Sequence, residues 1–460
     1  MSEHLTPEQI QEKWKPILEH EEISEIKDNY RKRVTGILLQ NEEEALKSEA
    51  NINEAPTNVV GGMDKYDPVL ISMVRRSVPA MLAFDIFGVQ PMKMPTGLIF
   101  ALRAQYGSQP KVGEDTTANE AQFHEADSGY SGAPRNPVDG TDPLSGGQGS
   151  DSSAYTGTFN DRPTPGTSDA TQTDPFAGDF GYGIGMDTDL AETLGEEAEW
   201  AKMSFTIEKL SVEAKSRGLK SEYSVELAQD LKAVHGLNAE QELANILSTE
   251  IISEQNREIL RRTYNMAVLG CQNADIATPG TYDLDVDSNG RWSVERFKGL
   301  MFQIEREANQ IAIDTRRGKG NWIVCSANVA SALAMTGLLD TAGNTKVTPG
   351  TVDPVGNLFV GVMNGMVRVY VDPYVTIDMC VVGYKGSNVY DAGAYYCPYI
   401  PLTLYKTVHS DSFQPRLGFK TRYGIGANPF VREYSGTSFN TGLEARKNIY
   451  FRIFKIDNLM

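Results

Sequence analysis

Apolar and polar residues recur with helical spacing over one unusually long stretch, residues 237–270. The spacing predicts a single helix of roughly 50 Å with one buried stripe. Asn238 fits the N-cap with Gln241 at the reciprocal position, and Gly270 fits the C-terminal stop. The expected buried stripe is Leu243, Ile246, Leu247, Ile251, Ile259, Leu260, Tyr264 and Ala267. Charged residues expected to face elsewhere are Glu240, Glu254, Arg257 and Arg261.

Shorter elements are predicted around this helix. Helices are expected over 69–83 (interrupted at Pro79), 222–234, 294–313 and 328–335. Strands are expected over 98–106, 205–207, 210–214, 322–325, 366–371, 379–382 and 447–456, with a bulge at Glu208–Lys209. The last strand is apolar on both faces, which favours a place inside a sheet. This succession predicts an α+β fold.

Composition divides the chain further. Residues 1–54 hold 13 acids and 7 bases and are too thinly apolar to build their own core. A Pro- and Gly-marked linker follows from Asn51. Between Val112 and Asp189 there are 14 acids, two bases and many Gly, Ser, Thr and Pro residues. This composition predicts a loop-rich surface insertion rather than core.

Net charge and cysteine usage exclude several functions. The net charge of −18, from 61 acids and 43 bases, disfavours nucleic-acid binding, which needs clustered Lys and Arg. Four widely spaced cysteines, with no Cys-x-x-Cys pair, predict reduced thiols. No signal peptide or membrane span is expected, because no apolar run is long enough to cross a bilayer.

Candidate sites for chemistry are weak. Asp285 to Gly290 matches the start of an EF-hand calcium loop, but position 296 is Arg where a bidentate Glu is needed, so an Asx-type turn is favoured. The basic cluster Arg316–Gly320 lacks the first Gly and the Ser/Thr of a phosphate-binding loop. The five histidines never reach metal-ligand spacing. Asp85, in an apolar stretch, is expected to be a paired or capped structural residue. No enzyme, metal or cofactor is therefore predicted.

Three long stretches carry a more specific signal. They are VRRSVPAMLAFDIFGVQPMKMPTGLIFALRAQYG ending at Gly107, the run from Glu208 to Gly270 that contains AKSRGLKSEYSVELAQDLKAVHGLNAE, and DAGAYYCPYIPLTLYKTVHSDSFQPRLGFKTRYGIGANPF from Asp391. They resemble the major capsid protein family of T-even-type tailed bacteriophages. The resemblance covers most of the chain from about residue 55.

The resemblance implies the Hong Kong 97 capsid fold, in which residues 237–270 form the spine helix. The implied organisation is an N-terminal prosegment (1–54), an N-arm with the first part of the E-loop (55–106), and an inserted domain (107–200). A second E-loop strand with the peripheral domain (201–320), an axial domain (321–430) and a C-terminal strand returning to the peripheral domain (431–460) complete it.

The resemblance also implies function. The subunit is expected in the capsid shell of the virion, as hexameric capsomers of an icosahedral lattice assembled in the host bacterial cytoplasm. Expected partners are a scaffolding core, a prohead protease, vertex and portal proteins and a folding chaperone. The prosegment of such subunits is removed after Glu in a Leu/Ile-x-Glu pattern. Ile52-Asn-Glu54 before Ala55 fits, although the triplets ending at Glu12, Glu19, Glu25 and Glu254 fit equally, and only Glu54 lies in the linker.

Three alternatives remain. The related capsid vertex protein would form pentamers on the same fold. A soluble enzyme is suggested only by the mixed last third and Asp85. A calcium-stabilised surface protein is suggested only by Asp285 to Gly290.

Overall fold

The computed structural model describes residues 7–19, 26, 28–52, 74, 78, 81–106, 121, 131, 188, 192, 200, 202–273, 275–288, 290, 292–337, 339–340, 358–388, 390–408, 413–431 and 443–459. The chain divides into two units. The first comprises Met1–Ile99, Leu210–Arg432 and Asn440–Met460, and the second comprises Phe100–Lys209 and Glu433–Phe439. Most of the acidic insertion predicted over residues 107–200 lies outside the described residues.

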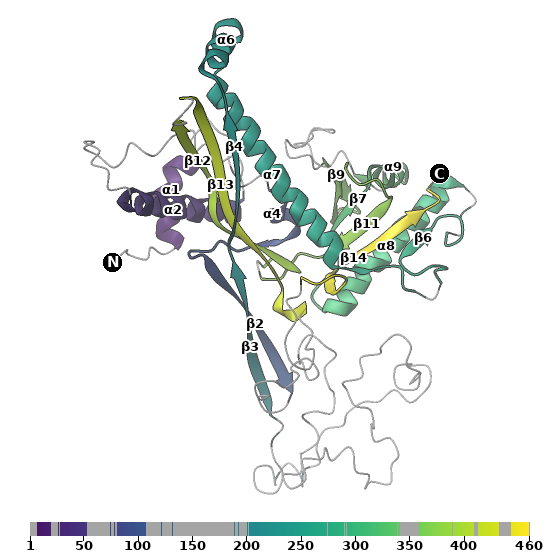
Figure 1. Cartoon of the computed structure of the whole chain (residues 1–460). Coiled ribbons are helices and arrows are strands. Elements are labelled where there is room, and N and C mark those ends of the chain that lie inside the picture. Colours follow the sequence, from purple (N-terminus) through teal and green to yellow (C-terminus); the bar gives the residue numbers. More distant parts are fainter. Residues whose placement is uncertain are drawn as a thin grey trace. The chain divides into compact units, whose positions relative to one another are not determined.

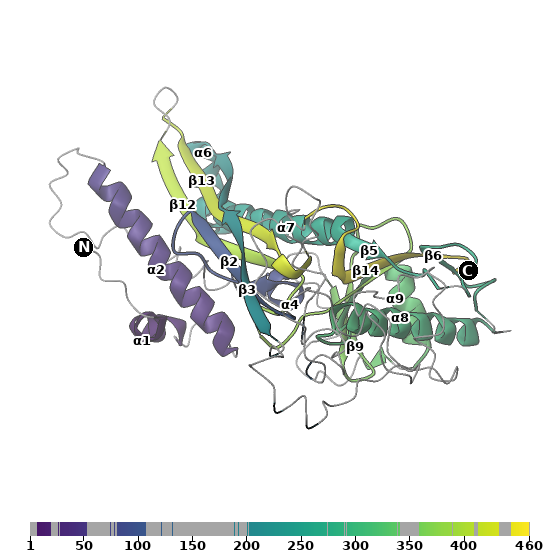
Figure 2. The same ribbon diagram turned by 90° about the horizontal axis from the view of Figure 1, so that it is seen from below.

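A four-stranded sheet in the order β1-β12-β13-β4 lies in the first unit. Its strands are β1 (Gly88–Val89), β12 (Ala394–Val408), β13 (Pro415–Ala427) and β4 (Lys215–Glu222). β12 pairs antiparallel with β13, and β13 pairs antiparallel with β4. Two long helices, α2 (Asn29–Ile52) and α7 (Ala239–Met266), flank this sheet (Figures 1 and 2). Leu247 and Ile251 of α7 pack with sheet residues Leu402, Leu417 and Phe419 in one buried cluster.

The predicted long helix is confirmed as α7. Its C-terminal end and one residue of its predicted buried stripe differ from the prediction. The Asn238 side chain accepts a hydrogen bond from the Glu240 backbone N–H, as an N-cap does. The helix ends at Met266 rather than at Gly270, because residues 267–269 leave it to form strand β5 (Ala267–Leu269), which pairs with β14. Ile246, expected in the buried stripe, is 61% exposed.

The second sheet of this unit has eight strands and a mixed topology. Its order is β5-β14-β11-β7-β10-β9-β8, with β6 also paired to β14. The strands are β6 (Thr281–Asp283), β7 (Trp322–Cys325), β8 (Leu339–Asp340), β9 (Leu358–Met363), β10 (Val367–Val371), β11 (Met379–Gly383) and β14 (Asn448–Asp457). Helices α8 (Ser293–Thr315) and α9 (Ala327–Met335) share a buried cluster with it. These elements confirm the predicted mixture of helices and strands.

The C-terminal strand β14 lies inside this sheet, as its apolar pattern predicts. It pairs antiparallel with β11 on one side and parallel with β5 and β6 on the other. Phe451 and Ile453 belong to the core cluster shared with α2 and α7, whereas Phe454 and Ile456 belong to the cluster shared with α8. β14 therefore joins the two cores of the unit.

Several short elements complete the first unit. They are α1 (Pro7–Leu18), α4 (Ala83–Ile86), α6 (Val225–His235) and the 3-10 turn η2 (Pro429–Val431). Helix α6 has Ser224 as its N-cap, whose side chain accepts from the Leu227 backbone N–H, and ends at Gly236 in the left-handed conformation. The predicted helix over 69–83 lies largely outside the described residues.

Strands β2 (Thr96–Tyr106) and β3 (Met203–Glu213) form a two-stranded sheet. The bulge expected at Glu208–Lys209 is not seen: the burial of β3 alternates without a break along all its residues. The apolar side chains change face instead. Phe205 and Ile207 lie on the exposed face, and Leu210 and Val212 lie on the opposite, more buried face.

Candidate functional site

The expected processing site follows helix α2. Ile52 is the last residue of α2, whereas Glu54 and Ala55 lie outside the described residues. The described part of residues 1–54 packs into the main core of the first unit rather than standing apart from it. Its buried apolar side chains are Ile10, Trp14, Leu18, Ile26, Val34, Ile37, Leu38 and Leu39.

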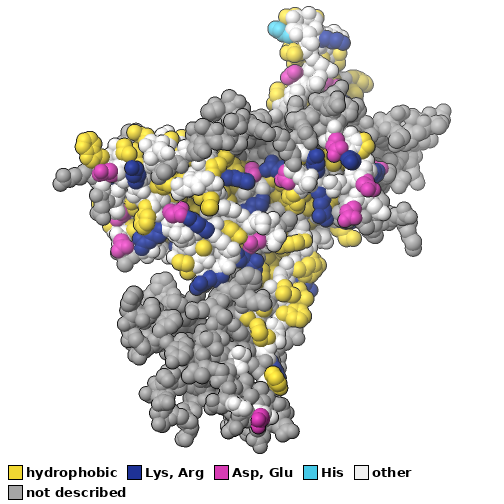
Figure 3. Space-filling model, turned by 180° about the vertical axis from the view of Figure 1, so that it is seen from behind, with side chains coloured by type: hydrophobic (Ala, Val, Ile, Leu, Met, Phe, Trp, Pro, Cys, Tyr) yellow, Lys and Arg dark blue, Asp and Glu magenta, His cyan; other side chains and the backbone are white. Residues whose placement is uncertain are grey.

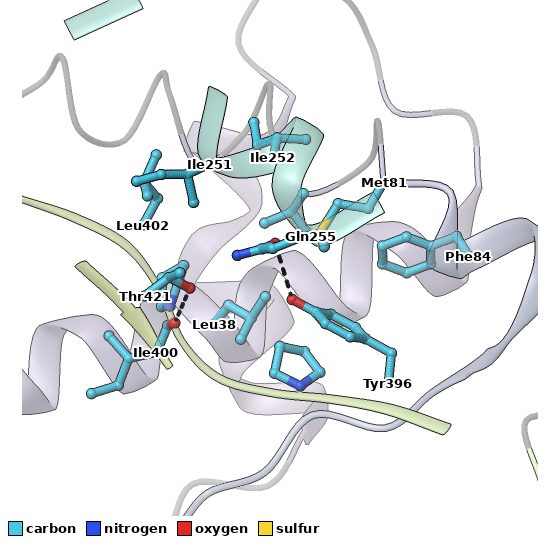
Figure 4. Close-up of a pocket in the computed structure, with 13 residues that line it drawn as sticks. Leu38, Met81, Phe84, Ile251, Ile252, Gln255, Tyr396, Ile400, Leu402 and Thr421 are labelled. Carbon is cyan, nitrogen blue, oxygen red and sulfur yellow. Dashed lines mark hydrogen bonds between the residues drawn. The ribbon is translucent and has the colours of Figure 1, made fainter. Parts of the chain in front are cut away.

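A small cavity lies where α2, α7 and β12 meet (Figure 4). Leu38 reaches it from α2, Ile251 from α7 and Leu402 from β12. Tyr396 donates a hydrogen bond to the Gln255 side chain at its edge, over 3.5 Å. Its volume of about 30 Å³ has room for a water molecule but not for an organic substrate. The cavity is therefore a packing defect at a junction of three elements.

The middle of α7 is fastened to the eight-stranded sheet through Asp372. Its side chain is fully buried and accepts from Arg257 Nη1 at 2.6 Å, Tyr264 Oη at 2.8 Å and the Tyr374 backbone N–H at 3.0 Å. Burial and the nearby carboxylate raise the pKa of Tyr264, which keeps its hydroxyl a neutral donor. Arg257, expected to face away from the buried stripe, is therefore held against the eight-stranded sheet of its own chain.

A second polar network joins α7 to the four-stranded sheet. Glu258 accepts from Arg217 of β4 at 2.5 Å and from Tyr423 of β13 at 2.5 Å, and Arg262 lies 2.8 Å from it. Burial raises the pKa of Glu258, but these hydrogen bonds outweigh burial and hold it below its usual value. Arg217 also pairs with Glu254 at 3.1 Å.

Glu240 and Arg261, the other two α7 residues expected to face away from the buried stripe along with Glu254 and Arg257, lie outside these two networks. Glu240 pairs with Lys406 at 2.5 Å, whereas Arg261 is exposed beside these networks. Of the four charged residues, Glu240, Glu254 and Arg257 thus bind within the chain.

The calcium-like sequence forms hydrogen-bonded turns. Asp287 accepts from the backbone N–H groups of Ala277 and Asp283, and the Asp285 backbone N–H donates to Asp283. Arg296, at the twelfth position, pairs with Asp285 itself. Among the described residues, no group of three or more His, Cys, Asp or Glu side chains has metal-binding geometry.

The other candidate residues also have structural partners. Asp85 lies 2.9 Å from Arg31 and 3.3 Å from Arg368, which identifies it as a paired structural carboxylate. In the basic turn, Arg317 pairs with Asp391 and Lys319 pairs with Glu305.

All four cysteines are free and buried, and burial raises the pKa of each thiol. No helix in the described part of the chain is long and apolar enough to cross a membrane.

An exposed apolar surface lies on the strand pair, within the second unit. Phe100 and Leu102 of β2 are 58% and 57% exposed, and Met203, Phe205 and Ile207 of β3 are exposed to a similar extent. Figure 3 shows apolar side chains gathered along this strand pair. We call these five residues the hairpin patch. Contiguous apolar patches of this kind mark interaction surfaces. In the sequence, apolar residues at alternate positions over 203–207 indicate this surface.

Comparisons with known proteins show which family the chain belongs to. A family model described as "Major capsid protein Gp23" matches residues 63–456. The chain belongs to this family. The major capsid protein of Salmonella phage ViI is 41% identical over 94% of this chain and 92% of its own length. That of Enterobacteria phage T4 is 36% identical over 97% of this chain and 98% of its own.

The Gp23 family assignment separates the two capsid alternatives. The capsid vertex protein of Enterobacteria phage T4 is 28% identical over only 51% of this chain and 55% of its own length. Among solved structures, the capsid of an empty GTA particle covers 90% of this chain and 97% of its own, at 9% identity and a TM-score of 0.38. The family model and the major capsid proteins that match over nearly their full length make this chain a major capsid protein of the T4-like group, a structural subunit of the virion shell. Its elements are those expected of the Hong Kong 97-type fold.

Proposed function

We propose that this chain is the non-catalytic subunit of hexameric capsomers in an icosahedral head shell. It assembles in the host cytoplasm with a scaffolding core, a folding chaperone, and vertex and portal proteins. The match to major capsid proteins over nearly the full length of both chains carries this proposal. We also propose the division into prosegment, N-arm and E-loop, insertion, peripheral domain, axial domain and C-terminal strand at the boundaries given above.

The hairpin patch supports assembly through β2 and β3. Five large apolar side chains exposed on one described surface are costly in an isolated subunit and favourable at an interface. We expect Phe205→Asp with Ile207→Asp to abolish shell formation while the subunit still folds, because both side chains are exposed in the monomer. Ser211→Asp is the control, since it adds one of the two negative charges at an exposed position of the same strand.

Shell formation by each variant is measured by electron microscopy of the chain expressed with its scaffold and chaperone. Hexameric lattices from the native chain and the control, and dispersed folded subunits from the double variant, support the proposal. Normal lattices from the double variant would remove the hairpin patch from the interface. Particles in which the chain occupies only five-fold positions would instead support the vertex role.

We further propose that a prohead protease cuts the chain after Glu54. Ile52-Asn-Glu54 begins at the last residue of α2, and the described core contacts of that helix end earlier, at Leu39. Removal of a segment with a net charge near −6 would lessen the repulsion of incoming DNA. Glu54→Ala should leave the full-length chain in particles, whereas the control Glu25→Ala, in a competing triplet, should leave processing intact. The intact mass of the particle subunit distinguishes the two, and processing that persists in Glu54→Ala would contradict the assignment.

A further inference from the structure

Helix α2 packs into a groove that the rest of the first unit forms. Val34, Leu38 and Leu39 are each at most 1% exposed, and they share one core cluster with Phe84 and Phe87 from beyond the expected cut. The helix packs against β12 of the four-stranded sheet, beside the cavity drawn in Figure 4. An apolar face of this kind gives the helix and its groove a shared, dry interface.

Polar contacts fix the helix in register. Asn41 donates through Nδ2 to the backbone oxygens of Met92, at 2.7 Å, and Tyr399, at 2.9 Å. Arg31 pairs with Asp85 at 2.9 Å. Tyr30 donates from its hydroxyl to the Val89 backbone oxygen. These acceptors belong to the part of the chain that remains after a cut at Glu54, so the groove offers a specific set of acceptors to this one helix.

Glu42 is one residue of α2 whose side chain is poorly suited to burial in this interface. Glu42 is 0% exposed, and among the residues that the structure describes neither of its carboxylate oxygens has a hydrogen-bond partner. A buried carboxyl without partners disfavours the state that buries it, because the ionised form is far better solvated in water. The amide nitrogen of the adjacent Asn41 donates two hydrogen bonds, so the buried position next to Glu42 is matched to the groove.

No neighbouring group in the described part of the chain compensates the burial of Glu42. The charged and titratable groups on the elements around α2 include Lys13 of α1, Asp85 of α4, Lys93 before β2 and Tyr399 of β12, and none of them hydrogen-bonds to Glu42. Lys13 binds Gln40 and Glu43 instead. Burial alone raises the pKa of Glu42 from 4.5 to about 8.

We propose that the surface beneath α2 is a helix-binding groove for the chain's own N-terminal segment, and that Glu42 makes this segment releasable once the chain is cut. While the chain is intact, the tether holds the helix at a high effective concentration and the groove stays filled. After the cut, the segment becomes a separate ligand whose affinity is lowered by the burial of Glu42. This inference rests on the proposed processing after Glu54.

The size of the effect follows from the proton that Glu42 must hold when it is buried. With a pKa of 4.5 in the free segment and about 8 in the groove, affinity falls about tenfold for each pH unit between these values. At pH 7 the carboxyl therefore weakens binding by about 300-fold relative to a neutral side chain of the same shape. Such differences appear mainly in the dissociation rate.

The test uses the full chain with a specific protease sequence inserted between Glu54 and Ala55. After cutting of the unassembled subunit, size-exclusion chromatography with mass spectrometry follows the retention of the 1–54 fragment at pH 6, 7 and 8. We expect the native fragment to leave faster at each higher pH. The Glu42→Gln fragment should stay at least about tenfold longer at pH 7 and lose its pH dependence. Glu12→Gln, an exposed position on α1, is the matched control and should behave as the native fragment.

Equal retention of the native and Glu42→Gln fragments would overturn the proposal, as would a native fragment that stays bound at pH 8 and above. Asn41→Ala gives a test in the opposite direction, because it should shorten retention at every pH. Far-ultraviolet circular dichroism must show that the remaining chain stays folded as the fragment leaves; unfolding would show the segment to be an integral part of the fold. A particle subunit that still began at Met1 would refute natural processing without changing the outcome of this engineered cut.

Discussion

The Asp372 contacts make a quantitative prediction about how α7 is held to the eight-stranded sheet. Arg257→Met keeps the apolar stem of the side chain but leaves the fully buried Asp372 carboxylate with only the neutral donors Tyr264 and the Tyr374 N–H. Removing one partner of a buried ion pair costs about 3–5 kcal/mol. Because the Arg257 side chain is 21% exposed and water still reaches it, we expect a loss of about 2–3 kcal/mol in the free energy of unfolding.

Urea unfolding of the unassembled subunit, followed by circular dichroism, measures this loss as a shift of the midpoint at constant slope. Tyr264→Phe should cost about 1.5 kcal/mol, the lower end of the range for a hydrogen bond to a charged group, because Asp372 keeps its other donors. Arg261→Met, one turn further along α7 and exposed, is the control and should change stability by less than about 0.5 kcal/mol. Equal midpoints for Arg257→Met and Arg261→Met would refute the reasoning.

Three further predictions concern packing, a buried ion pair and pH. Gly383→Ala should lose at least about 2 kcal/mol, because the added Cβ would overlap the buried Trp322 ring. Arg452→Met should lose about 3 kcal/mol or more, because it leaves Glu307, 2% exposed, without the guanidinium 2.7 Å away. Glu42→Gln should raise stability at pH 7 by about 3 kcal/mol. The native chain binds one more proton at Glu42 when folded, so its stability falls as pH rises from 4.5 to about 8.

Each of these has a matched control and a contradicting result. Gly218→Ala meets its nearest atom only at 3.5 Å and should be tolerated; equal losses at both glycines would contradict the packing argument. Replacing Glu307 and Arg452 together by apolar residues should cost less than Arg452→Met alone, and a larger loss would count against the charge argument. Stability that varies identically with pH in the native chain and Glu42→Gln would show that Glu42 does not titrate in this range. Thermal or urea unfolding measures all three.

Local patterns predicted most of the elements. Helix α6 ends where the sequence predicts, at Gly236, but it begins at Val225 rather than at Glu222, because Glu222 belongs to β4 and Ser224 caps the helix. The N-terminal half of α7 follows from Asn238 for the same reason. β14 follows from a run that is apolar on both faces, since only a strand inside a sheet can bury both.

Features set by distant partners could not be predicted. α7 ends early because residues 267–269 pair with β14, far along the chain. Arg257 faces inward because Asp372, 115 positions later, lies against it. The groove for α2 is also formed by residues far along the chain. The sequence shows that residues 1–54 have too few apolar side chains to form a core, but it does not show which surface they pack against. Glu42 in particular reads as one of three consecutive surface acids.

As a shell subunit of a T4-like capsid, this chain is proposed to form hexamers. The most direct measurement is electron microscopy of particles at a resolution that traces the chain. We predict six copies of the chain around each local six-fold axis, with the hairpin patch of each copy buried against a neighbouring copy. Particles whose hexamers are built by another protein, or in which the hairpin patch faces solvent, would contradict the account.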